Sequence, residues 1–92
     1  MKVSQLRPTR RFKKRLSLLS AQRQRRIREA LRLLLTDPHN AKLRLHGLKG
    51  EFADTYSISA GGDLRIHFEL IEDGTKQVAV LQSVGTHSQL YR

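Results

Sequence analysis

The chain contains no cysteine, so it can form neither disulfide bonds nor a cysteine-ligated zinc site. It has no apolar run long enough to span a membrane or to act as a secretory signal, and we therefore expect a cytoplasmic protein without membrane contacts. Histidine pairs at the spacings of metal ligands are missing too, which gives no support to a metal ion or other cofactor. Walker-type and nucleotide-binding glycine motifs are absent, so ATP-dependent chemistry has no support either.

Acidic residues are scarce and unevenly placed. The 92 residues include 18 lysines and arginines but only 8 acids, for a formal net charge of +10. Residues 1–46 contain 14 of these cations and 2 acids, whereas residues 47–92 contain 4 cations and 6 acids. The strongly basic N-terminal half indicates a polyanionic partner, most often nucleic acid, or an acidic protein. The length leaves room for one domain, residues 1–92, with one modest core.

The basic half begins with the pattern of a short strand and an amphipathic helix. Residues 2–6 alternate weakly in hydropathy and are followed by a proline, as is typical of an edge strand. Thr9 can cap a helix whose apolar side is formed by Phe12, Leu16 and Leu19. Cations crowd the rest of its surface and are candidate RNA contacts: Arg10, Arg11, Lys13 and Lys14.

A second helix is predicted to begin after Ser20 and to end at Asp37 and Pro38. Only a few residues separate the two helices, so we expect an antiparallel helical hairpin. The apolar residues of the second helix recur at the helical period: Ile27, Ala30, Leu31, Leu34 and Leu35.

Three strands are predicted in the second half, at residues 52–59, 62–70 and 77–84, with glycine-containing turns between them. The middle strand has two unlike faces, because apolar and polar residues alternate along it. One face has Leu64, Ile66, Phe68 and Leu70, and the other has Arg65, His67 and Glu69.

The hydropathy pattern also predicts a register for the first hairpin. With residues 60–62 as a loop, Ser59 lies opposite Asp63, and Ser57 shares the face of His67. The element order is then β-α-α-β-β-β, an α+β fold. A helical hairpin packs on one face of an antiparallel sheet made of an N-terminal strand and a three-stranded meander. No residues are left for a further helix.

Three of the four histidines, His46, His67 and His87, fall beside or within the predicted sheet. Histidine can act as an acid or a base near neutral pH because its ordinary pKa is about 6.5. Arg65 can offer a planar fork of donors to a phosphate, and Tyr91 offers a ring on which an unstacked base can rest. This set of side chains suits metal-independent cleavage of RNA.

The motifs around these residues resemble those of the RelE/ParE superfamily, the toxins of bacterial type II toxin–antitoxin systems. The resemblance is closest to the YafQ-like branch of ribosome-dependent mRNA interferases, and it covers nearly the whole chain in element order. The similar segments are His46-Gly47-Leu48-Lys49-Gly50, Gly62 to Phe68, and Val84-Gly85-Thr86-His87, with Tyr91 near the terminus.

The resemblance implies an endoribonuclease site with no cofactor. His87 would be the general acid, and His46 with Asp63 would place or deprotonate the nucleophile. Arg65 and Lys49 would stabilise the phosphate, while Tyr91 would contact the RNA.

The chain departs from this family pattern on the strand before the hairpin. YafQ-like toxins have an acidic residue and a further histidine there, where this sequence has Ser57 and Ser59. His67 lies one strand away on the same predicted face, and it is the candidate substitute for the missing histidine.

The resemblance also implies partners: a cognate antitoxin protein, and the 30S A site of the ribosome with its mRNA. Two other functions fit the sequence. A ParE-like toxin would inhibit DNA gyrase through protein contacts alone, on the same fold. A basic nucleic-acid-binding module would depend on the cations of residues 10–32 rather than on the histidines.

Overall fold

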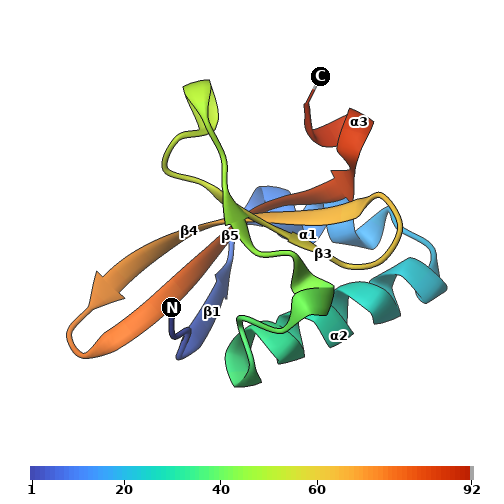
Figure 1. Ribbon diagram of the computed structural model, residues 1–92. Coiled ribbons are helices and arrows are strands. Elements are labelled where there is room, and N and C mark those ends of the chain that lie inside the picture. The colour runs from blue at the N-terminus through green and yellow to red at the C-terminus, as the bar shows by residue number, and fades with distance from the viewer. Residues whose placement is uncertain (92) are drawn as a thin grey trace.

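A five-stranded mixed sheet of order β1-β5-β4-β3-β2 forms the centre of the computed structural model, which describes residues 1–91 (Figure 1). Three α-helices and two 3₁₀ helices, η1 and η2, surround it. In chain order the elements are β1 (Gln5–Pro8), α1 (Arg10–Ser17), α2 (Ala21–Thr36), η1 (Ala41–Leu43), β2 (His46–Gly47), η2 (Gly50–Phe52), β3 (Tyr56–Ser59), β4 (Leu64–Asp73), β5 (Lys76–Thr86) and α3 (His87–Leu90).

The predicted α+β architecture is confirmed, including the antiparallel meander of β3, β4 and β5. The expectation of a wholly antiparallel sheet was wrong, because β1 pairs with β5 in parallel and Leu6 lies beside Ala79. Parallel neighbours need a long connection between them. Here the connection from β1 to β5 includes the helical hairpin and the strands β2, β3 and β4.

Thr9 connects the start of α1 to the sheet. Its Oγ1 accepts a hydrogen bond from the amide of Phe12 at 3.2 Å, which caps the helix. The same hydroxyl donates to the carbonyl oxygen of Leu81 in β5, at 2.7 Å. The cap therefore fixes where α1 begins and also where it lies against β5.

Helix α2 begins at the predicted cap, Ser20, whose Oγ accepts from the amide of Arg23 at 3.2 Å. It ends at Thr36, because the residue before a proline disfavours helical backbone and Pro38 follows Asp37. The chain runs along α1 and then back along α2, roughly in the opposite direction (Figure 1). The predicted helical hairpin is thus present.

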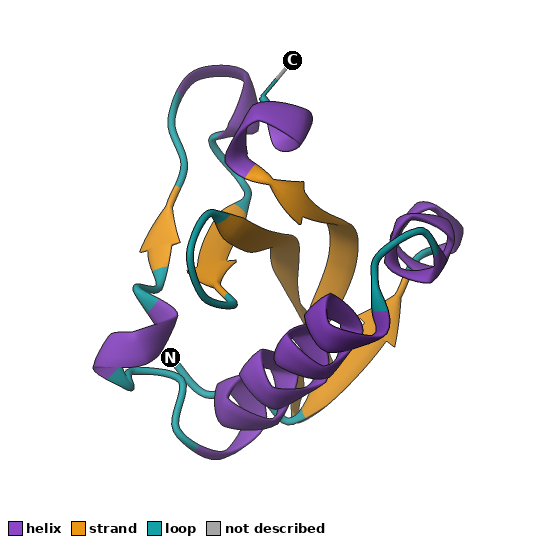
Figure 2. Ribbon diagram, turned by 90° about the vertical axis from the view of Figure 1, so that its right-hand side faces the viewer, coloured by secondary structure: helices purple, strands orange, loops and turns teal. Residues whose placement is uncertain are grey.

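The core lies between the helices and one face of the sheet (Figure 2). Phe12 of α1 and the apolar stripe of α2 meet the inward side chains of β3, β4 and β5 there. Burial of this apolar area is the main stabilising contribution in a domain of this size. The largest fully buried side chains are Phe68, Ile27, Leu34, Leu43, Ile58, Ile66 and Leu81.

The first hairpin has a register two residues away from the predicted one. Ser59 lies opposite Arg65, not Asp63, and the loop consists of residues 61–63. Both glycines of this loop, Gly61 and Gly62, have positive φ values, of 101° and 55°. A loop centred on them closes without strain. Because the shift is an even number of residues, every side chain keeps its predicted face.

A β-bulge explains why the register of β5 was ambiguous from the sequence. His67 lies opposite Ser83, whereas the next residue, Phe68, lies opposite Leu81. Gln82 is therefore the extra residue of the bulge. It reverses the alternation of β5, so that Leu81 and Val84 both face the core although they are three residues apart.

Three further differences concern short elements. The prediction that no helix follows the last strand was wrong, because Thr86 caps the short helix α3. Strand β3 begins at Tyr56 rather than at Phe52, since residues 50–52 form η2. His46 and Gly47 form the two-residue strand β2 at the sheet edge. Within residues 1–91, no helix combines the length and the apolar character needed to cross a membrane.

The two helix caps give a test of how α1 is attached. Thr9→Ala removes a cap and also the hydrogen bond to β5, whereas Ser20→Ala removes only a cap. We expect Ser20→Ala to lower the free energy of unfolding by about 1 kcal/mol and Thr9→Ala by about 2 kcal/mol. Urea denaturation of both variants measures this. Equal losses would show that the contact with Leu81 contributes nothing.

Candidate active site

A row of polar residues crosses the face of the sheet that is turned away from α1 and α2. His46 of β2 pairs with Ser57 of β3, Ser57 pairs with His67 of β4, and His67 pairs with Ser83 of β5. Side chains of directly opposed residues point to the same face, and neighbouring strands lie about 4.8 Å apart. Four strands therefore bring two histidines and two serines into one line.

His67 is the buried centre of this row, with only 4% of its surface exposed. Burial, and after it charge repulsion from the nearby His46 and His87, lowers its pKa to about 4. The ring is therefore neutral at neutral pH. Its Nε2 and the Oγ of Ser83 are both buried without a hydrogen-bond partner among the described residues. Unpaired buried polar atoms are rare and are a signal of a functional site.

Aromatic rings cover His67. Its ring lies 5.2 Å from that of Tyr91 and 6.3 Å from that of Phe52, centroid to centroid, in both cases edge to face. Phe52 and Tyr91 also contact each other, at 5.7 Å. Phe52 belongs to η2 and Tyr91 follows α3, and both elements lie at the upper end of the molecule in Figure 1. Two short elements thus close over one imidazole.

His87 stands at the exposed rim of this cluster, with its ring centroid 4.5 Å from that of Tyr91. It is the first residue of α3, and its amide donates to the carbonyl of Asp63 at 3.0 Å. Thr86 caps the helix, and Gln89 completes a capping box by accepting from the Thr86 amide.

Gly85 is the residue that makes room for this capping box. A Cβ at Gly85 would lie 2.8 Å from Oε1 of Gln89, which is too close for an unshifted side chain. The Gly-Thr-His segment therefore has a structural explanation. Glycine admits the Gln89 side chain, threonine caps the helix, and His87 is presented on the first turn.

His46 is exposed and its ring orientation is fixed. Its Nδ1 lies 2.7 Å from the carbonyl oxygen of Arg44. A carbonyl oxygen can only accept, so Nδ1 has the proton. In the neutral ring, Nε2 then has a free lone pair, which is the arrangement required of a general base.

Arg65 stabilises the β3–β4 turn through hydrogen bonds. Its Nη1 donates to the carbonyl oxygen of Gly62 at 2.7 Å, to that of Leu64 at 3.0 Å, and to Oγ of Ser59 at 3.2 Å. Among the described residues, its Nε and Nη2 have no protein acceptor. The guanidinium thus has one group engaged by the turn and the remaining donors available on the histidine side of β4.

The remaining candidates lie in three places. Asp63, in the turn, is exposed and is held beside His87 by the main-chain hydrogen bond. Lys49 is exposed and precedes η2. The structure does not bring the cations of α1 to the histidines, because α1 packs on the opposite face of the sheet through Phe12. These cations are Arg10, Arg11, Lys13 and Lys14, all exposed.

Sequence reasoning missed Phe52 and Ser83. Phe52 lies in a segment predicted as strand, and Ser83 was hidden by the bulge at Gln82. An aromatic residue two positions after the Gly50 of the His-x-Leu-x-Gly motif was the available signal for Phe52. Among residues 1–91, no group of three or more histidine or acidic side chains is arranged to hold a metal ion.

The fold matches solved toxin structures over nearly the whole chain. YafQ from Escherichia coli superposes with a TM-score of 0.77 at 17% identity, covering 97% of this chain and 99% of that chain. A YoeB/ParE toxin from Agrobacterium tumefaciens gives 0.74 at 19%, covering 95% and 99%. The E. coli DinJ–YafQ toxin–antitoxin complex gives 0.74 at 18%, covering 100% of both chains. No protein-family model and no curated protein sequence matches the chain.

At these identities the likeness establishes the fold. The RelE-like fold expected from the sequence, near that of YafQ, is therefore confirmed. The roles of the individual site residues stay predictions.

The buried histidine predicts a dependence of stability on pH. His67 binds a proton more weakly in the folded state, with a pKa of about 4, than in the unfolded state, where it is ordinary. Protonation therefore favours unfolding, and stability should fall by roughly 3 kcal/mol as the pH falls from 6.5 to 4. Urea denaturation at several pH values should show this loss in the wild type and not in His67→Gln. The matched control, His39→Gln in an exposed loop, should keep the wild-type slope.

Proposed function

We propose that this protein is the toxin of a type II toxin–antitoxin system and that it cleaves mRNA on the ribosome. One observation supports this most: three histidines from β2, β4 and α3 gather on one face of the sheet beside an exposed tyrosine. The middle imidazole is neutral and buried, while the outer two are exposed. An exposed acid and an exposed base on either side of a neutral group suit general acid–base catalysis.

The reaction is transfer of a phosphodiester within the RNA chain. The 2′-oxygen forms a bond to the adjacent phosphorus, and the bond from phosphorus to the 5′-oxygen of the next nucleotide breaks. One proton leaves the 2′-hydroxyl and one proton joins the departing 5′-oxygen. The products are a 2′,3′-cyclic phosphate and a free 5′-hydroxyl, so neither water nor a metal ion needs to enter the bond-making step.

His87 is the general acid in this proposal. As an exposed side chain on the first turn of α3, it can exchange protons with solvent between turnovers. His46 is the general base, since its Nε2 lone pair is free when Nδ1 donates to Arg44. Asp63 helps His46 to place the nucleophile, and the main-chain hydrogen bond to His87 holds its turn at the edge of the site.

His67 is assigned a positioning role. A ring that is neutral at pH 7 and almost fully buried exchanges protons poorly with solvent, but it can hydrogen-bond an RNA hydroxyl that reaches its Nε2. This gives His67 the place of the histidine that YafQ-like toxins have on the neighbouring strand.

Charge and stacking complete the site. The free donors of Arg65, together with Lys49, stabilise the phosphate as negative charge develops on its oxygens. The exposed side of Tyr91 is a platform for an unstacked base. On the other face of the sheet, the cations of α1 contact ribosomal RNA and hold the protein in the 30S A site.

An antitoxin is the second partner of this proposal. The structures named DinJ–YafQ and RelBE2 are complexes of proteins with this fold and their antitoxins. A ParE-like function, in which the protein inhibits DNA gyrase without chemistry, uses the same fold and remains the alternative. The match to a YoeB/ParE toxin favours neither over the other. The histidine cluster favours RNA cleavage, because a protein that only binds gyrase has no need of it.

Replacing the proposed general acid tests the reaction. We expect His87→Ala to lower the rate of RNA cleavage by about 10²- to 10⁴-fold, while the fold stays intact because the side chain is exposed. The experiment is induction in a bacterial host, with determination of mRNA 5′ ends on translated and untranslated transcripts. His39→Ala is the matched control and should cleave like the wild type.

The 5′-end experiment also separates the two toxin functions. Cuts confined to translated frames, lost in His87→Ala, would support the proposal. Growth arrest of equal strength in the wild type and His87→Ala, with no such cuts, would contradict it and favour gyrase inhibition.

Tyr91 gives a second, independent test. Tyr91→Phe keeps the ring that covers His67 and stacks on a base, whereas Tyr91→Ala removes it. We expect Tyr91→Phe to stay within about threefold of the wild type and Tyr91→Ala to fall by about 10- to 100-fold, as the loss of one base stack implies. Single-turnover cleavage on programmed ribosomes measures both rates. Equal activity of the two variants would remove Tyr91 from the site.

A further inference from the structure

Two buried polar atoms on the histidine face of the sheet have no hydrogen-bond partner among the described residues. They are Nε2 of His67 and Oγ of Ser83. The two residues are directly opposed on β4 and β5, so their side chains leave the sheet next to each other on one face. Only 4% of His67 and 6% of Ser83 is exposed. These two atoms form a small polar niche beneath the rings of Phe52 and Tyr91 that cover His67.

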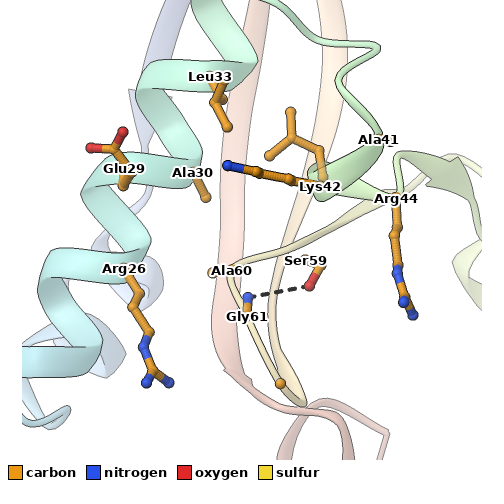
Figure 3. A pocket seen from close by; sticks show the side chains of 12 residues that line it. Arg26, Glu29, Ala30, Leu33, Ala41, Lys42, Arg44, Ser59, Ala60 and Gly61 are labelled. Atoms are coloured by element: carbon orange, nitrogen blue, oxygen red, sulfur yellow. Dashed lines mark hydrogen bonds between the residues drawn. The ribbon is translucent and has the colours of Figure 1, made fainter.

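Another buried serine, Ser59, shows the ordinary arrangement. Its Oγ accepts hydrogen bonds from the amide of Gly61 and from Nη1 of Arg65, both at 3.2 Å. It lies at a groove of about 690 Å³ between α2, η1 and the β3–β4 turn, where the bond to Gly61 is drawn (Figure 3). Neither His67 nor Ser83 lines that groove. The niche is therefore an exception, and its unpaired atoms destabilise the free protein.

A hydroxyl group is the ligand that satisfies both atoms of the niche. It can donate one hydrogen bond and accept another, so it bridges the imidazole and the serine whichever ring nitrogen of His67 has the proton. A phosphate oxygen fits less well, because the imidazole is neutral at neutral pH and an unpaired charge is costly to bury. In RNA the hydroxyl that every nucleotide within the chain has, and that DNA lacks, is the 2′-hydroxyl of the ribose.

The niche lies on the far side of His67 from the proposed general base. Across the sheet the order of residues is Ser83, His67, Ser57 and His46. The strand of His46 lies roughly 10 Å from that of His67, at two strand spacings. A general base must come within about 3 Å of the hydroxyl that it deprotonates. A hydroxyl held in the niche therefore belongs to a different nucleotide from the one whose 2′-oxygen attacks.

We propose that Ser83 and His67 together bind the 2′-hydroxyl of a nucleotide next to the cleaved one. Both atoms are covered in the free protein, so Tyr91 moves aside as the RNA enters, and the atoms gain their partners only in the complex. Ser83 is accordingly a positioning residue that fixes the neighbouring ribose on the sheet. This role rests on the RNA cleavage proposed above, but binding of a ribose hydroxyl in the niche can be measured without cleavage.

Spectra of the histidine ring nitrogens in the full-length ¹⁵N-labelled protein test this contact. The probes are an oligoadenylate of five ribonucleotides and the deoxyribonucleotide of the same sequence. We expect the Nε2 resonance of His67 to shift with the RNA and not with the DNA, and the shift to be smaller in Ser83→Ala. Equal shifts with both probes would overturn the proposal, because the niche would then bind a base or a phosphate. The absence of a shift with either probe would overturn it as well.

Single-turnover cleavage on programmed ribosomes tests the consequence for the reaction. The mRNAs have one 2′-deoxynucleotide, on either the 5′ or the 3′ side of the cleaved nucleotide. We expect one of the two to slow the wild type by about tenfold and Ser83→Ala by no more than about twofold, since the variant has already lost the hydrogen bond. Ser4→Ala, at an exposed serine, is the matched control and should respond like the wild type.

The outcomes separate this proposal from the proposed function. Equal slowing of the wild type and Ser83→Ala by the deoxynucleotide would overturn the role of Ser83 while cleavage itself stands. Absence of cleavage by the wild type would contradict the proposed function, and the ring spectra would then decide whether the niche binds a ribose.

A purely structural role for Ser83 predicts a different result. If a permanently buried water joined the two atoms, Ser83→Ala would remove one of its partners and lower the midpoint of urea denaturation. We expect the midpoint of Ser83→Ala to equal or exceed that of the wild type, because the hydroxyl has no partner in the free protein. A lower midpoint would overturn the proposal in favour of the buried water.

Discussion

The two-faced alternation of β4 is the constraint on which the rest of the structure depends. Ile66 and Phe68 are fully buried against the helices, and His67 between them points to the opposite face. A shift of β4 by one residue would exchange these faces and would destroy the core and the histidine cluster together. The hydrophobic effect that fixes the register of the core therefore also positions the polar side chains.

The separation of charge follows from the same two faces. The cations of α1 lie on the helix side of the sheet, whereas His46, His67 and His87 lie on the other side. Few carboxylates stand near either group, and the ion pairs of the described residues, Arg7 with Asp73 and Arg32 with Glu29, lie at the surface. Such pairs contribute little to stability. The excess of positive charge is accordingly available to partners.

Features that depend on the periodicity of the sequence could be predicted from it. Features that depend on tertiary contacts could not. The helix caps Thr9 and Ser20, the apolar stripes and the face of His67 followed from local spacing. The parallel pairing of β1, the bulge at Gln82 and the position of Phe52 over His67 each depend on residues far away in the chain. The sequence identified the candidate site residues, whose roles stay predictions, but it did not indicate which of them are buried. In particular, nothing local to β4 indicates that His67 is covered.

The short helix α3 makes one side of the candidate site less stable than the sheet. It has four residues, and isolated helices of that length are not stable in water, so its order depends on the capping box at Thr86 and on ring contacts of Tyr91. Local opening of such a terminal segment requires much less free energy than unfolding of the sheet. His87 and Tyr91 can therefore leave the cluster while the core remains folded. Heating or proteolytic trimming would then open the candidate site before the secondary structure of the sheet melts.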